Sequence, residues 1–87
     1  MREIPESLQC HVASFQTYLS IVNQVKAEVI SCIGEGKSNG EIAAKLHLTE
    51  WTIKKYISEI LTETQLKNRT QIALLYLISN DISDRQS

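Results

Sequence analysis

Apolar residues recur at intervals of three and four along almost the whole chain, which is the periodicity of amphipathic helices. No stretch alternates apolar and polar residues as a half-buried strand does. The pattern predicts five helices, at about residues 5–20, 24–34, 39–46, 50–63 and 70–80. A chain of 87 residues has the length of one small domain. The sequence therefore predicts a single all-α domain.

Local signals support these helix boundaries. Pro5 suits the first turn of a helix, and Gly34 and Gly36 suit the end of the second. Ser38 and Glu41 have the spacing of a capping box. Residues of the N-cap type precede the other helices: Asn23, Thr49 and Thr70. The helices at 39–46 and 50–63 are separated by only a few residues, which is the layout of a helix-turn-helix.

The charge of the chain is unevenly distributed. The formal net charge is −1, but it divides into −2 over residues 1–36, +2 over 37–70 and −1 over 71–87. The positive charge therefore coincides with the predicted helix-turn-helix. The excess is mild, so charge alone does not establish nucleic-acid binding.

The helix at 50–63 has one apolar and one polar face. Because each residue advances about 100° around the axis, Ile53 and Ile57 point inward together. The opposite side carries Trp51, Lys55, Ser58 and Thr62 and is flanked by Lys54 and Glu59; this side together with Lys54 is called here the outer face. Lysines and hydroxyls can bind phosphates and base edges, and an indole can pack on a sugar or a thymine methyl. From these residues alone, a solvated helix face with one exposed aromatic ring is an equal alternative.

Four motifs follow one another in residues 28–73: Gly34-Glu35-Gly36, Ser38-Asn39-Gly40-Glu41, Thr52-Ile53-Lys54 and Asn68-Arg69-Thr70. With their spacing they resemble the LuxR/GerE-type (NarL/FixJ-like) helix-turn-helix, the DNA-binding module of many bacterial response regulators and quorum-sensing regulators. The resemblance covers about half of the chain and extends more loosely to residue 80. It implies a four-helix LuxR-type domain at 22–80, preceded by a helical extension at 1–21 for packing or dimerisation and followed by a flexible tail at 81–87. The family also includes short stand-alone proteins, and we expect this chain to be of that subtype.

The resemblance also implies roles for individual residues. The helix at 50–63 would enter the major groove, and its base and nearby phosphate contacts would fall on Lys54, Lys55 and Ser58. Contacts to the DNA backbone would come from Thr49, Thr52, Asn68, Arg69 and Thr70. Apart from the resemblance, we expect Trp51 or Thr52 to lie against the backbone. The last helix, at 70–80, commonly forms the dimer interface in this family.

Some positions depart from the family pattern. Lys26 stands where a capping-box glutamate is usual, so the reciprocal cap is lost. Gln65 replaces a glycine at the end of the recognition helix, so we expect this helix to end differently or to run longer. Glu59 and Glu63 occupy positions where basic residues are frequent, and we expect them to repel phosphate.

The last predicted helix is apolar on two sides. Ile72, Leu75 and Tyr76 form one side, and a surface helix needs no more than one. The second side would be covered by the first helix of the same chain or by a second subunit. We expect a homodimer, with this interface: Leu74, Leu77, Ile78, Leu8, Val12 and Phe15. Burial of the whole patch within one chain is the alternative.

Catalytic and metal chemistry find little support. Gly36-Lys37-Ser38 resembles the end of a P-loop, but Ser31 stands at the position of the first glycine and a helix precedes it. The two histidines have no acid–base partner at a telling spacing, and the cysteines and histidines lack zinc spacing. We therefore expect no enzyme activity, no cofactor and no metal. Cys32 is interpreted as a core residue, whereas Cys10 is either a spare thiol or the site of a redox-controlled disulfide between subunits.

No apolar run approaches the length of a membrane helix, and residues 1–6 lack the apolar stretch of a signal peptide, so we expect a cytoplasmic protein without membrane contact. Two hypotheses on function follow. The first is a dimeric, sequence-specific transcriptional regulator whose partner is double-stranded DNA. The second is a protein-interaction module, such as an antagonist of a larger regulator, that keeps the fold without tight DNA binding. The second is motivated by the near-neutral net charge, by the acidic amino-terminal extension, and by Glu59, Glu63 and the exposed Trp51.

Overall fold

A computed structural model describes the backbone of residues 6–86 and the side chains of residues 12–80. Over the described backbone the chain forms five helices and no strand, which confirms the all-α prediction. The helices are α1 (Glu6–Ile21), α2 (Gln24–Gly34), α3 (Asn39–Leu46), α4 (Glu50–Thr64) and α5 (Arg69–Gln86). The largest difference from expectation is at the carboxyl end, where α5 continues through residues 81–86 instead of ending near residue 80.

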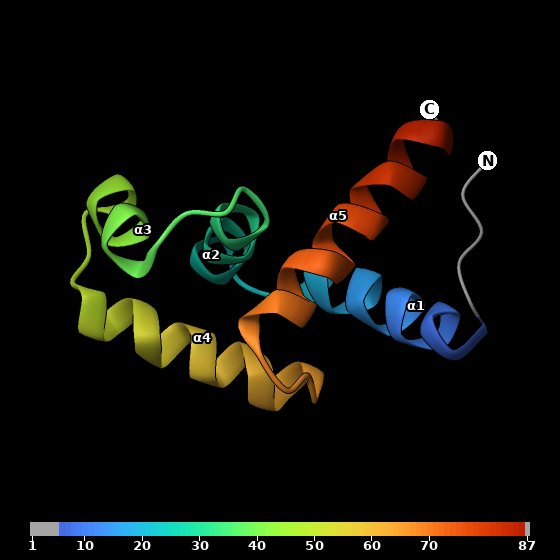
Figure 1. Cartoon of the computed structure of the whole chain (residues 1–87), viewed down its shortest axis with the longest axis horizontal. Coiled ribbons are helices and arrows are strands. Elements are labelled where there is room, and N and C mark those ends of the chain that lie inside the picture. The colour runs from blue at the N-terminus through green and yellow to red at the C-terminus, as the bar shows by residue number, and fades with distance from the viewer. Residues whose placement is uncertain (1–5, 87) are drawn as a thin grey trace.

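The helices form two groups joined by α2 (Figure 1). The short α3 packs on α4 to form the helix-turn-helix, and α1 packs on α5 at the other end. The central α2 contacts both α4 and α5. As a result, α4 lies along one edge of the molecule, with one face toward the core and the other toward solvent.

Isoleucines dominate the core. Ile30, Ile42, Ile53, Ile60 and Ile72, contributed by α2, α3, α4 and α5, are fully buried. Burying a side chain of this size contributes about 1.5–3 kcal/mol. The core therefore ties all four helices of the expected domain to one another.

The first helix adds to the same core. Val12 and Phe15 are 4% and 2% exposed within the single chain. Both residues were expected in a dimer interface, but their side chains already pack against this chain's own helices. The stripe of α1 that carries them thus covers one side of α5 from within the chain.

Most of the predicted caps are present. The Asn23 side chain accepts a hydrogen bond from the Lys26 backbone N–H at 2.9 Å, which starts α2. Ser38 and Glu41 form the reciprocal capping box of α3. The prediction for α5 was wrong: the Asn68 side chain accepts from the Gln71 N–H at 3.0 Å, and Thr70 lies in the first turn.

Gly34 permits a close approach between α2 and α5. A Cβ atom at this position would lie 2.5 Å from the ring of Tyr76, well inside van der Waals contact. The Tyr76 hydroxyl in turn lies 3.2 Å from the Ser31 hydroxyl oxygen, to which it donates. Glycine at the end of α2 therefore sets how tightly α5 packs there.

Candidate nucleic-acid interface

The outer face of α4 is separated cleanly from its buried face. Ile53 and Ile60 are fully buried and Ile57 nearly so, whereas Trp51 is 71% exposed. The other exposed side chains of the outer face are Lys54, Lys55, Ser58 and Thr62. The side chains predicted from helical spacing to emerge together thus do so, next to the turn that follows α3.

The beginning of α4 is held by hydroxyl groups. The Thr49 hydroxyl oxygen accepts from the Thr52 N–H at 3.2 Å, as predicted for an N-cap, and the two threonine hydroxyls lie 2.9 Å apart. One turn on, the Lys55 ammonium lies 5.8 Å from the centre of the Trp51 ring. An exposed cation–π contact of this kind contributes about 0.5–1 kcal/mol. It keeps an aromatic ring and a positive charge side by side at the start of the helix.

The turn between α3 and α4 depends on a left-handed residue. His47 ends α3 with φ of 59°, and the Leu48 N–H donates to the Ala43 carbonyl at 2.9 Å. This closes the helix in the manner of a Schellman motif. The sharp turn fixes the angle at which α4 leaves α3.

The end of α4 is also closed by a left-handed residue. Gln65 has φ of 61°, and its N–H donates to carbonyls of the preceding turn. The helix therefore ends at Thr64, close to the expected boundary, although a glutamine stands where the family pattern has glycine. A side chain in this conformation is strained, since Cβ approaches the carbonyl oxygen.

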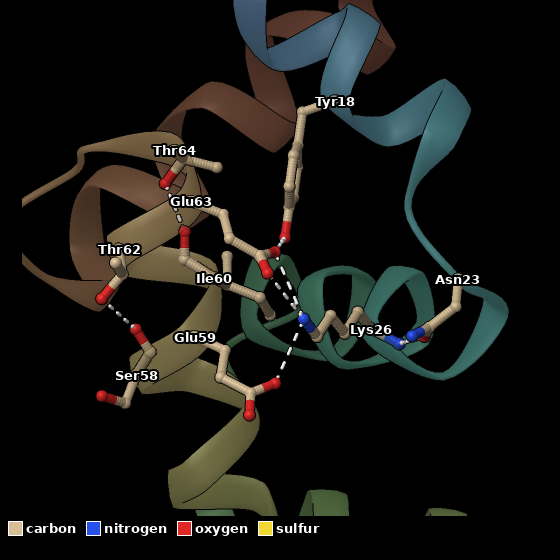
Figure 2. Close-up of polar contacts among 9 residues, drawn as sticks. All are labelled: Tyr18, Asn23, Lys26, Ser58, Glu59, Ile60, Thr62, Glu63 and Thr64. Carbon is tan, nitrogen blue, oxygen red and sulfur yellow. Dashed lines mark hydrogen bonds and ion pairs between the residues drawn. The ribbon is translucent and has the colours of Figure 1, made fainter.

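One flank of α4 is tied to α1 and α2 by a polar network (Figure 2). The Lys26 ammonium lies 3.1 Å from a carboxylate oxygen of Glu59 and 3.1 Å from one of Glu63. The Tyr18 hydroxyl donates to the same Glu63 carboxylate from the opposite side. We call these four residues the Lys26 network.

The Lys26 network changes the interpretation of two glutamates. Glu59 and Glu63 were expected to repel phosphate, but both carboxylates are directed toward Lys26. The Lys26 side chain is only 11% exposed, so the pairing also satisfies a buried ammonium. The two departures from the family pattern, a lysine on α2 and glutamates on α4, are therefore partners in one contact. Both departures are visible in the sequence, but nothing in their spacing indicates that they meet or that Tyr18 joins them.

The pKa values of the network follow from this geometry. The pKa of Glu63 is lowered because Tyr18 and Lys26 donate hydrogen bonds to its carboxylate. Burial acts to lower the pKa of Lys26, but the hydrogen bonds and charges of Glu63 and Glu59 outweigh it and raise the value. The pKa of Tyr18 is raised by burial and by the adjacent Glu63 carboxylate. At neutral pH the phenol is therefore neutral and remains a donor to the charged Glu63.

The turn before α5 is occupied by contacts within the chain. The Arg69 guanidinium donates to the Asn39 side-chain oxygen at 2.6 Å and to the Lys37 carbonyl at 2.8 Å. Arg69 was expected at the DNA backbone, but these bonds use it to hold the start of α3. Asn68 is the cap of α5, and Thr70 is exposed. Arg69 thus fixes the helix-turn-helix to α5.

An apolar surface remains on α5. Leu74 and Leu77 are 48% and 52% exposed, three residues apart on the side away from the buried Ile72 and Leu75. Ile78 is half-buried against the core. The side chains of Leu8 and Cys10, two further candidates, lie outside the described residues.

Comparison with known proteins identifies the family to which this arrangement of helices belongs. Residues 24–76, which span α2, α3, α4 and the first two turns of α5, match the model for bacterial regulatory proteins of the luxR family. This chain belongs to the luxR family. It therefore carries the helix-turn-helix domain of a DNA-binding transcription regulator, as the resemblance implied. The extension that contains α1 precedes the matched segment.

Similar proteins include regulators of greater length. The chain is 36% identical over 76 residues to the uncharacterized transcriptional regulatory protein YhcZ of Bacillus subtilis, covering 84% of this chain and 35% of that protein. It is 43% identical over 47 residues to the transcriptional regulatory protein LnrK of the same species, covering 54% and 21%. It is 32% identical over 62 residues to the response regulator protein VraR of Staphylococcus aureus, covering 71% and 29%. The chain thus spans about a third or less of the curated relatives it matches.

The family and these relatives are regulators and not enzymes. No helix within the described residues is long and apolar enough to cross a membrane. Among the side chains that the structure describes, no three histidines, cysteines or acids gather as a set of metal ligands.

Proposed function

We propose that the chain binds a specific DNA sequence by inserting α4 into the major groove. The observation that carries the proposal is the exposure of Trp51, Lys54, Lys55 and Ser58 on one face of a helix whose isoleucines are buried. The lysines would bind phosphates and guanine acceptors, and Ser58 would add a hydrogen bond to a base edge or phosphate. Thr49, Thr52 and Thr70 would contact the flanking phosphates.

The Lys26 network supports this proposal over a domain that keeps the fold without DNA. Because Glu59 and Glu63 pair with Lys26, their charge is partly neutralised on the flank of α4. The protein-interaction hypothesis thereby loses the support of Glu59 and Glu63, whereas the near-neutral charge and the acidic amino-terminal extension remain. The exposed Trp51, which also motivated that hypothesis, lies beside Lys55 and would equally serve as a contact to a sugar or a thymine methyl.

We further propose that two copies pair through α5. Leu74 and Leu77 are the exposed apolar residues of its described part. A symmetric pair would place two copies of α4 one DNA turn apart, where they would bind a palindromic site. Leu74→Glu/Leu77→Glu should convert a dimer to a monomer in analytical ultracentrifugation. A wild-type chain that sediments as a monomer up to high concentration would refute the pairing.

The DNA proposal is tested by selecting duplexes from a random pool with the wild-type chain. Selection should yield one reproducible sequence, whose affinity falls steeply with salt because bound phosphates release counterions. Lys54→Ala/Lys55→Ala should weaken binding by about 100-fold or more while helicity is unchanged. Lys45→Ala, which removes one exposed charge from α3, serves as the control and should cost far less. Unchanged affinity in the double variant would refute the role of the outer face.

A further inference from the structure

The carboxyl-terminal half of α4 is held from two separate elements. Glu63 Oε1 accepts from the Tyr18 hydroxyl on α1 and from the Lys26 ammonium on α2, the latter at 3.2 Å, and Oε2 is 3.1 Å from the same ammonium. Glu59, one turn earlier, pairs with the Lys26 ammonium but has no hydrogen bond from Tyr18. Glu63 is therefore the point at which α1, α2 and α4 are joined by polar atoms (Figure 2).

Tyr18 belongs to a part of the chain that precedes the family-matched segment, 45 residues from Glu63. Its ring is steadied by the buried Phe15, whose centre lies 6.5 Å away at an angle of 35°. Phe15 in turn is part of the core. The hydroxyl thus belongs to a helix that packs into the core, and it is directed at the flank of α4.

The joined flank lies beside the outer face. Ser58 directly precedes Glu59, and Lys55 lies one turn before it. A shift of the helix at Glu63 would therefore carry these side chains with it. Contacts to base edges depend on direction and distance, whereas attraction to phosphate tolerates displacement.

We propose that Tyr18 is a positioning residue for DNA recognition: through its hydrogen bond to Glu63, α1 sets the orientation of α4 without touching DNA. This inference rests on the proposed function. Its signature is a loss of specific binding that leaves non-specific binding nearly intact. By this inference α1, which lies outside the family match, has a role in sequence recognition.

The test compares two duplexes, one selected by the wild-type chain and one of the same composition in shuffled order. Tyr18→Phe removes the hydroxyl and keeps the ring. It should weaken binding to the selected duplex measurably, by at most about three- to tenfold. The value of one hydrogen bond to a charged group at a partly exposed site sets this limit, because the bond is also present in the free protein. Binding to the shuffled duplex should change little. Circular dichroism well below the unfolding midpoint verifies that each variant is folded.

Repeating the Tyr18→Phe comparison in a Glu63→Ala variant separates a positioning role of Tyr18 from a general effect on the structure. In Glu63→Ala the partner of the hydroxyl is gone, so adding Tyr18→Phe should cause no further loss of specific affinity. Tyr76→Phe is the matched control, because its hydroxyl bonds Ser31 on α2 and not α4. That variant should bind both duplexes as the wild type does.

Equal affinity of Tyr18→Phe and wild type for the selected duplex would overturn the inference, as would an equal loss in the Glu63→Ala background. If Lys54→Ala/Lys55→Ala abolishes binding while Tyr18→Phe is neutral, the inference fails and the DNA proposal stands. If the wild-type chain selects no sequence, both fail.

Discussion

The Lys26 ammonium lies 3.1 Å from a carboxylate oxygen of Glu59, across the interface between α2 and α4. Lys26 is buried, whereas Glu59 and Glu63 are more than a third exposed. The pair is therefore asymmetric. Water can replace lysine as a partner of the carboxylates, but it has little access to the ammonium.

This asymmetry predicts unequal costs for removing either partner. Lys26→Met leaves two carboxylates that water can solvate, and we expect a loss of about 1 kcal/mol in the free energy of unfolding. Glu59→Gln/Glu63→Gln leaves a buried ammonium without a charged partner, and we expect the larger loss. Urea unfolding at neutral pH measures both. The opposite ranking would mean that the ammonium reaches solvent.

The network also predicts acid sensitivity. The pKa of Glu63 is lower in the folded chain, so its contribution to stability is present above the ordinary glutamate pKa of about 4.3 and is lost as the pH falls through the folded value. The unfolding midpoint should therefore drop between about pH 5 and pH 3. Glu63→Gln should flatten this decline.

Glu41 is a second carboxyl group that should contribute to the acid sensitivity. The pKa of Glu41 is lowered by the hydrogen bond from the Ser38 N–H in the capping box. Glu41 lies on α3, away from the network, so its effect should add to that of Glu63 in a double variant. An acid decline of unchanged steepness in Glu63→Gln would contradict the role assigned to its carboxylate.

Gln65 should be replaceable by glycine with a gain in stability. It holds φ of 61°, where a Cβ atom is strained and glycine is not. We expect Gln65→Gly to raise the free energy of unfolding by about 0.5–1 kcal/mol. Thr64→Gly, one residue earlier and still helical, is the control and should lower it by about 1 kcal/mol. A loss in both variants would indicate that the Gln65 side chain makes contacts that matter more than its strain.

Ser79 offers a test of a buried hydroxyl. Its side chain is 3% exposed, and its oxygen has no hydrogen-bond partner within the described residues. Ser79→Ala should leave stability unchanged or raise it by up to about 1 kcal/mol, because an unpaired buried polar group is removed. Ser31→Ala, which removes the acceptor of the Tyr76 hydroxyl, should be destabilising by comparison. Thermal melts of the two variants decide between these outcomes.

The sequence predicted what local chemistry controls. The bounds of α2 and α3 and the caps at Asn23, Ser38 and Thr49 agree with the structure because each depends on residues within one turn. The polar side chains of the outer face followed from helical spacing in the same way. Thr70 was the wrong cap because Asn68, two residues earlier, provides a competing side-chain acceptor.

What the sequence did not predict depends on contacts between distant segments. Lys26 and Glu63 are 37 residues apart, and Arg69 and Lys37 are 32 apart. No local spacing indicates that these residues meet. A flexible tail was expected at 81–87, with Asp81 and Asp84 in it, whereas α5 continues through residues 81–86.

Trp51 gives the chain a built-in optical reporter. It is the single tryptophan of the sequence, and its ring stands largely in water at the start of α4. Its emission should therefore be that of a hydrated indole and should shift to shorter wavelength or be quenched when the ring is covered. Unlabelled protein can thus signal when the first turn of α4 is occupied, independently of events at the opposite end of the molecule.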